Sequence, residues 1–286
     1  FDATLIEYRV LRETIVVWVI APDAFHTHVL PVSIGEIESA IAAVESPAQE
    51  SMVRANASFL YDVLVRRIEP LLKDAETLVI VPDDDLERIA YSGLYDRVQQ
   101  RWLLDRCATF VAPSAELFAQ SRRRWNERST REDSVVVVRA AAGSLDAAAL
   151  PEAAREAQSI AGLYRNARVI DGARTTTGSL LRELHESSVL QFVGHTVVDA
   201  DPSSRTLRLG ESQQARLSMA DVAGAALPGM RLVYLSACET DRGPILKSEG
   251  SITLARSFFA AGVPVLVGTT LWSRKSGSAD PPTTPS

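Results

Sequence analysis

Two apolar runs decide the fold of this chain: Val-Leu-Gln-Phe-Val-Gly-His at 189–195 and Arg-Leu-Val-Tyr-Leu-Ser-Ala-Cys-Glu-Thr at 231–240. Each begins as a short, continuous apolar stretch, which is typical of a strand buried on both faces of a parallel sheet. Each then reaches a reactive side chain, His195 in the first and Cys238 in the second. Because ligands bind beyond the carboxyl ends of the strands in open α/β sheets, we expect these two side chains to meet there.

Similar apolar runs recur from Thr77 onward, and helical patterns lie between them. This alternation predicts an α/β fold with a doubly wound, mostly parallel sheet flanked by helices. The other apolar runs lie at 77–82, 109–112, 134–139, 168–170 and 263–267, and the helical patterns at 95–106, 114–125, 152–164, 177–186, 218–226 and 249–261.

The amino-terminal part has a different pattern. Residues 5–10 and 14–20 are β-branched and partly alternating, which predicts a β-hairpin, and 26–32 is a candidate third strand. Helices are expected from Ser33 and over 50–72. We therefore divide the chain into an N-terminal hairpin-and-helix region (1–76), an α/β domain (77–272) and a tail rich in Ser, Pro, Thr and Gly (273–286) that is expected to be disordered.

Composition excludes several classes of function. A net charge of −6 argues against nonspecific binding to nucleic acid or to an anionic membrane. The longest purely apolar runs fall well short of the ~20 residues that a spanning helix needs, so no membrane association is expected. The two cysteines, Cys107 and Cys238, have no metal-binding or disulfide-framework spacing, which favours a reducing, cytoplasmic setting.

No cofactor or metal is expected from the motifs. The chain lacks a phosphate-binding loop, a dinucleotide fingerprint and a Gly-x-Ser-x-Gly elbow. What remains is Gly194-His195 and Cys238. A thiol attacks as thiolate, so a catalytic cysteine needs a base such as an imidazole. The alternative is that both are structural, as expected for Cys107, which reads as a core residue, and for His26 and His28, which read as solvent-facing.

Further motifs carry a family resemblance. They are Leu-Ser-Ala-Cys-Glu-Thr at 235–240, Ser-Glu-Gly at 248–250 opening a helix to Gly262, and Val-Leu-Val-Gly-Thr-Thr-Leu-Trp at 265–272. Together they resemble the CHAT domain, the caspase-like domain often found beside tetratricopeptide repeats, in the wider caspase and separase group of cysteine peptidases. The resemblance extends to Val-Gly-His at 193–195, Leu-Val-Ile-Val-Pro-Asp at 78–83 and the opening hairpin, and so covers residues 4–272.

The resemblance implies a role for each residue of the site. His195 would be the general base and Cys238 the nucleophile, without metal or organic cofactor. The backbone amides of Thr196 and Cys238 would stabilise the oxyanion. The implied partners are a protein substrate and a tetratricopeptide-repeat region upstream in a longer chain.

Two positions depart from the family pattern. Thr196 stands where relatives often have a small residue, and its β-branched side chain would crowd the oxyanion site or narrow the cleft. After Trp272, Ser-Arg-Lys-Ser-Gly replaces an acidic turn, so the domain is expected to be truncated at its C-terminal end.

Acidic residues near the pair have alternative readings. Asp199 and Asp201 would select a basic substrate side chain or simply solvate a loop, and Glu239 would shape the cleft. The sequence thus supports a caspase-like cysteine endopeptidase. It leaves open a catalytically inert regulatory or scaffold domain acting by protein–protein interaction, and a small-molecule hydrolase or acyltransferase that uses the same thiol.

Overall fold

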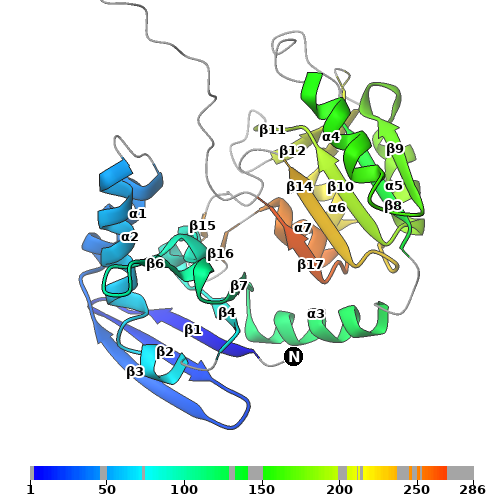
Figure 1. Cartoon of the computed structure of the whole chain (residues 1–286). Coiled ribbons are helices and arrows are strands. Elements are labelled where there is room, and N and C mark those ends of the chain that lie inside the picture. Colours follow the sequence, from blue (N-terminus) through cyan, green and yellow to red (C-terminus); the bar gives the residue numbers. More distant parts are fainter. Residues whose placement is uncertain are drawn as a thin grey trace, which may run out of the picture.

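The chain folds around two five-stranded sheets (Figure 1). The architecture is that of a computed structural model. It describes residues 3–45, 50–72, 75–128, 133–140, 151–198, 205–210, 212, 215–236, 245–246, 250–251 and 253–268.

The first sheet has the strand order β3-β2-β1-β4-β7. The hairpin strands β1, β2 and β3 pair antiparallel, whereas β4 joins β1, and β7 joins β4, in parallel. Helices α1 and α2 pack on one face of this sheet. The bounds are β1 Thr4–Val10, β2 Thr14–Ile20, β3 Phe25–Pro31, β4 Thr77–Val81, β7 Ala108–Val111, α1 Ile34–Glu45 and α2 Glu50–Leu64.

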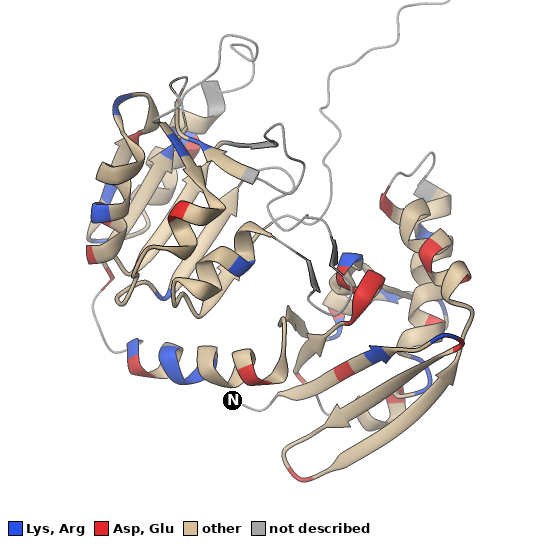
Figure 2. Cartoon of the chain, turned by 180° about the vertical axis from the view of Figure 1, so that it is seen from behind, with Lys and Arg blue, Asp and Glu red and all other residues tan. Residues whose placement is uncertain are grey.

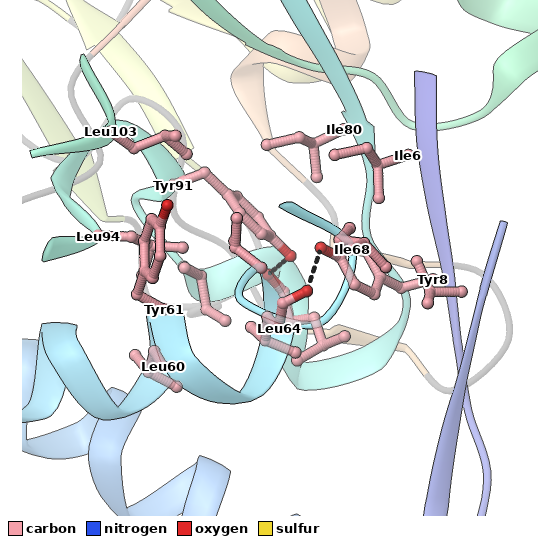
Figure 3. Packing of buried hydrophobic residues seen from close by; sticks show 14 of the residues in the cluster. Ile6, Tyr8, Leu60, Tyr61, Leu64, Ile68, Ile80, Tyr91, Leu94 and Leu103 are labelled. Atoms are coloured by element: carbon pink, nitrogen blue, oxygen red, sulfur yellow. Dashed lines mark hydrogen bonds between the residues drawn. The ribbon is translucent and has the colours of Figure 1, made fainter. Parts of the chain in front are cut away.

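Alternation along the hairpin explains this packing. In β2, every second residue is buried, so Ile15, Val17 and Val19 face the helices. The same cluster contains Tyr8 of β1, whose hydroxyl donates a hydrogen bond of 3.2 Å to the backbone oxygen of Leu64 at the end of α2 (Figure 3). A buried phenol needs such a partner, and here the bond ties the sheet to the helix that covers it.

The second sheet is entirely parallel, with the order β17-β14-β10-β8-β9. Helix α4 covers one face, and α5, α6 and α7 cover the other. The bounds are β8 Val135–Arg139, β9 Ala167–Asp171, β10 Val189–Val193, β14 Leu232–Ser236, β17 Val265–Val267, α4 Pro151–Ala161, α5 Thr177–Glu186, α6 Met219–Ala223 and α7 Leu254–Ala260.

Strand β8 shows why these sequences are continuously apolar. Val135 and Val137 pack with Ala157 of α4, whereas Val136 and Val138 pack into the cluster on the opposite face. All four valines are at most 1 % exposed. A strand covered on both faces needs apolar residues at every position.

Three smaller pieces of sheet complete the described structure. β11 (His195–Val198), β12 (Arg205–Arg208) and β13 (Arg216–Ser218) form an antiparallel sheet directly after β10. β15 (Ile245–Leu246) pairs with β16 (Gly250–Ser251), and β5 (Tyr95–Asp96) pairs with β6 (Arg101–Trp102).

Helix α3 (Ala115–Arg128) connects the two sheets (Figure 1). Its last residue, Arg128, donates hydrogen bonds to the backbone oxygens of Met230 at 2.6 Å and Gly262 at 2.8 Å. These two residues precede β14 and β17, so one guanidinium holds the amino ends of two neighbouring strands.

A second charged contact lies at the same end of the sheet. The guanidinium of Arg231 donates to both carboxylate oxygens of Asp133, at 2.5 and 2.7 Å, and lies 5.1 Å from the ring centroid of Trp125. Asp133 precedes β8 and Arg231 precedes β14. The amino-terminal ends of β8 and β14 are therefore held together by an ion pair as well as by the pairing of the strands in the sheet.

The predicted α/β class, with a mostly parallel sheet flanked by helices, is confirmed, but the strands are distributed differently from the expectation. β4 and β7, which the sequence placed with the later strands, pair with the hairpin instead. The physical reason is that β1 offers β4 a partner over four residue pairs, from Thr4↔Leu78 to Glu7↔Val81. The division of the chain at residue 76 stays a prediction.

The helix predicted over 95–106 is wrong. Two short strands, β5 and β6, and a 3₁₀ turn occupy this stretch. The Asp96 carboxylate accepts the backbone N–H groups of Val98 and Gln99, which favours a turn over a helix, and Gln100 has a φ of 52°, in the left-handed region.

Other expectations concern residues outside this description. The predicted connection after Ala140, at 141–150, and the predicted disordered tail at 273–286 both lie outside the described residues. The altered C-terminal end after Trp272 does as well. Among the helices that the structure describes, none has the length and apolar character to cross a membrane.

Candidate active site

The two strands that precede the predicted pair in the sequence lie next to each other. β10 and β14 are parallel neighbours, with five residue pairs in register from Val189↔Leu232 to Val193↔Ser236. One further hydrogen bond extends this contact, because the backbone N–H of Gly194 donates to the backbone oxygen of Ser236 at 3.1 Å. The expectation that these two runs form neighbouring parallel strands is confirmed.

The register relates His195 to Cys238. In the sequence, His195 and Cys238 each follow the last register pair, Val193↔Ser236, by two residues. His195 is the first residue of β11, and its backbone pairs with Arg208 of β12. Cys238 and the side chain of His195 lie outside the described residues, so the sulfur-to-imidazole distance stays untested.

Gly194 gives the chain its path at this point. A Cβ atom added there would lie 2.3 Å from the Cβ of Ala140 and 3.0 Å from the Cζ of Phe192. Real side chains do not approach so closely, which means that only glycine fits between the ends of β8 and β10. The residue before the histidine is therefore set by packing.

The position within the sheet is also favourable for a site. From β8 the chain proceeds to β9 on one side, whereas from β10 it proceeds to β14 on the other. The backbone N–H of Ala140 donates to the backbone oxygen of Val193 at 2.9 Å, so the ends of β8 and β10 lie side by side. Crevices at such reversals of strand order are the usual ligand sites of open α/β sheets.

Polar side chains from α4 and from the strands lie at the carboxyl-terminal ends of the strands in the second sheet. The Ser236 hydroxyl donates to Oε1 of Glu156 on α4 at 3.2 Å. At the ends of β8 and β9, Arg139 forms an ion pair with Asp171 at 2.8 Å. The Glu156 carboxylate thus contacts Ser236, the residue that precedes Cys238 by two positions in the sequence. The sequence did not single it out, because nothing distinguishes it from other polar residues on a helix.

The remaining predicted site residues are placed only in part. Thr196 lies in β11, with its backbone opposite Leu207 of β12. Asp199, Asp201 and Glu239 lie outside the described residues. The oxyanion role of the Thr196 and Cys238 amides, and the pocket role of the three acids, therefore stay predictions.

Cys107 serves as the internal comparison. It is 6 % exposed, and its thiol donates to the backbone oxygen of Leu103 at 3.9 Å. Burial raises the pKa of the Cys107 thiol, which disfavours the reactive thiolate. The prediction that Cys107 is a core residue is confirmed.

His26 and His28 lie on β3 of the first sheet and not at the candidate site on the second sheet. His26 is exposed and His28 is partly buried, so the solvent-facing prediction holds fully only for His26. Across the described part of the chain, no three His, Cys, Asp or Glu residues come close enough together to hold a metal ion.

These features define a class of protein. A mostly parallel sheet with helices on both faces is consistent with a caspase-like α/β protein. The model of the CHAT domain family matches residues 54–277, well over half of the chain. The chain belongs to the CHAT domain family, within the caspase-like, peptidase-related superfamily. No curated protein gives a significant match.

Proposed function

We propose that this protein is a cysteine endopeptidase in which His195 and Cys238 form the catalytic dyad. The observation that supports the proposal is that β10 and β14 are parallel neighbours whose register ends at Val193↔Ser236, a pair that His195 and Cys238 each follow by two residues in the sequence. Residues at equivalent positions on neighbouring parallel strands start about 4.8 Å apart, within reach of a thiol and an imidazole.

The reaction follows from the two side chains. His195 takes the proton of the Cys238 thiol, and the thiolate attacks the carbonyl carbon of the scissile peptide bond. The resulting oxyanion accepts hydrogen bonds from the backbone amides of Thr196 and Cys238. The imidazolium then gives its proton to the leaving amine, and a thioester forms. Water, deprotonated by His195, hydrolyses the thioester and restores the thiol.

The substrate class follows from charge. Asp199, Asp201 and Glu239 are close to the dyad in sequence and are all acidic. Carboxylates around a cleft attract a basic side chain, so we propose that the protein substrate presents Lys or Arg near the scissile bond. A reducing compartment such as the cytoplasm would keep the thiol active, and an upstream repeat region in a longer chain would supply further substrate contacts.

Selective alkylation tests the dyad. Iodoacetamide at pH 7 should modify Cys238 at least about tenfold faster than the buried Cys107, as followed by peptide mass spectrometry. His195→Ala should abolish the difference, and His26→Ala, which alters an exposed histidine of the first sheet, should preserve it. Equal rates for the two cysteines in the unchanged protein would remove the basis of the proposal.

Cleavage of a peptide library tests the activity itself. Products that require Lys or Arg next to the cleaved bond, and that disappear in Cys238→Ala, are the expected result. Selective alkylation without any cleavage would point instead to the regulatory or scaffold function. Ester turnover without peptide cleavage would indicate a small-molecule hydrolase.

A further inference from the structure

The two five-stranded sheets have four edge strands, and β3 differs from the other three. β3 has seven residues, whereas β9 has five, β7 has four and β17 has three. β9 also carries charge, because its Arg168 pairs with Glu183 at 2.7 Å and its Asp171 pairs with Arg139. Short length and charged side chains are the common ways in which edge strands avoid pairing with other chains.

β3 has neither protection. Its sequence, Phe-His-Thr-His-Val-Leu-Pro, contains no Lys, Arg, Asp or Glu, and Figure 2 accordingly shows it without charge colouring. Two large apolar side chains on it face solvent, Phe25 at 63 % and Val29 at 58 % exposure. Successive residues of a strand point to opposite faces of the sheet. Leu30 is buried on the inner face, against the helices, so Phe25 and Val29 point to the outer face, away from α1.

The outer face of the sheet next to β3 is also apolar. On the outer face, Phe25 lies opposite Ile20 of β2, and Val29 lies opposite Val16. Among the strand residues on this face, the nearest charged ones are Glu7 and Arg9 of β1, two strands away from the edge, or about 10 Å. Asp23 lies outside the strand, in the turn that precedes β3. Two copies meeting edge to edge would therefore bring uncharged surface against uncharged surface.

We propose that β3 pairs antiparallel with β3 of a second copy of this chain, about a two-fold axis at Thr27. A two-fold axis perpendicular to the sheet keeps the outer faces of both copies on the same side. Pro31 has no N–H group to donate, so pairing is confined to the residues before it. An axis at Thr27 meets this condition, since it pairs residues 25 to 29 with 29 to 25.

This register is self-complementary. It places Phe25 of each copy opposite Val29 of the other, so the two exposed apolar side chains bury each other twice. Aromatic and β-branched cross-strand pairs are among the stabilising pairs of antiparallel sheets. On the inner face, His26 lies opposite His28. The two first sheets become one continuous sheet, and the unpaired edge disappears.

A charge-sign experiment tests both the interface and the register. In Phe25→Lys/Val29→Lys, ammonium groups face each other across the two-fold axis, whereas in Phe25→Lys/Val29→Glu opposite charges face each other. Sedimentation velocity of the full chain, from about 1 to about 200 µM, should show a monomer–dimer equilibrium for the unchanged protein. The dissociation constant should rise about 100-fold in the Lys/Lys variant and stay within about tenfold in the Lys/Glu variant.

Leu163→Lys is the matched control. Leu163 is 80 % exposed but lies after α4, outside any edge strand, so its change should leave the dissociation constant unaltered. A monomer at every concentration, or a Lys/Lys variant that dimerises as well as the unchanged protein, would overturn the proposal. Equal loss of the dimer in the Lys/Lys and Lys/Glu variants would overturn the Thr27 axis. Far-UV circular dichroism confirms that each variant is folded.

Discussion

The backbone N–H of Gly194 donates a hydrogen bond of 3.1 Å to the backbone oxygen of Ser236, just beyond the last register pair of β10 and β14. This contact joins the residue before His195 to a residue two positions before Cys238. Backbone pairing thus continues to the residue immediately before His195, on the strand next to the one that precedes Cys238 in the sequence.

Gly194→Ala should damage both stability and reactivity. The new Cβ would meet Ala140 at 2.3 Å, so the ends of β8 and β10 must separate, at a cost of about 1–3 kcal/mol in unfolding free energy. Urea unfolding measures this loss, and alkylation of Cys238 should slow in the same variant. Gly35→Ala is the control, because a Cβ on this α1 residue has no atom within 4 Å and should be neutral or stabilising. Equal stabilities would contradict the packing argument.

The ion pair of Arg231 with Asp133 should contribute substantially to stability. Arg231→Met removes hydrogen bonds to both carboxylate oxygens and the contact with Trp125, and should cost about 2 kcal/mol. Arg97→Met is the control. Arg97 pairs with Asp62 at 2.9 Å but is 70 % exposed, so its loss should cost less than about 1 kcal/mol. The prediction fails if urea unfolding gives the two variants the same stability.

Asp96 should make the first half of the molecule acid-sensitive. Burial by itself raises the pKa of this carboxyl, but hydrogen bonds from Arg66 at 2.6 Å and from the backbone N–H groups of Gln99 and Val98 outweigh burial and lower the pKa overall. A lowered folded-state pKa contributes stability above the unfolded value of about 3.9. That contribution is lost as the pH falls below this value and through the folded one.

Asp96→Asn tests this acid dependence. The variant should be less stable than the unchanged protein at pH 7, and it should lose less stability between pH 5 and pH 2, because the amide does not titrate. Urea unfolding at several pH values provides the measurement. Asp23→Asn, at an exposed turn position, should instead follow the unchanged protein. An unchanged acid dependence in Asp96→Asn would contradict the role of this carboxylate.

Glu156→Gln should speed the alkylation of Cys238. Glu156 accepts a hydrogen bond from Ser236, and a carboxylate near a thiol disfavours the thiolate. Removal of the negative charge should lower the thiol pKa and raise the alkylation rate at pH 7 about two- to fivefold. Glu127→Gln, on α3 away from this edge, should leave the rate unchanged. A slower rate in Glu156→Gln would show that the carboxylate supports the cysteine instead.

The strands of the second sheet could be predicted because their physical signal is local. A run such as Val135 to Val138 is apolar at every position, and burial on both faces requires this. The neighbouring placement of β10 and β14 followed from the same reasoning. Membership of a sheet could not be predicted in this way. β4 is as continuously apolar as β8, and only its distant partner β1 assigns it to the first sheet.

The error at 95–106 has a different cause. Apolar spacing there resembles a helix, but Asp96 binds the turn backbone and the guanidinium of Arg66, 30 residues earlier. Such long-range pairing leaves no trace in a local pattern. Likewise, the hydrogen bond from Ser236 to Glu156 depends on how α4 packs against the sheet. The sequence alone therefore does not identify Glu156 as a neighbour of the site.

The contacts at the amino-terminal ends of the strands in the second sheet suggest where substitutions can be tolerated during evolution. Arg128, Asp133 and Arg231 hold the amino-terminal ends of β8, β14 and β17, whereas His195 follows the carboxyl-terminal end of β10. Under the proposed function, substitutions near His195 can therefore change substrate preference without weakening the contacts at the amino-terminal ends. In that case stability and substrate preference depend on opposite ends of the same sheet.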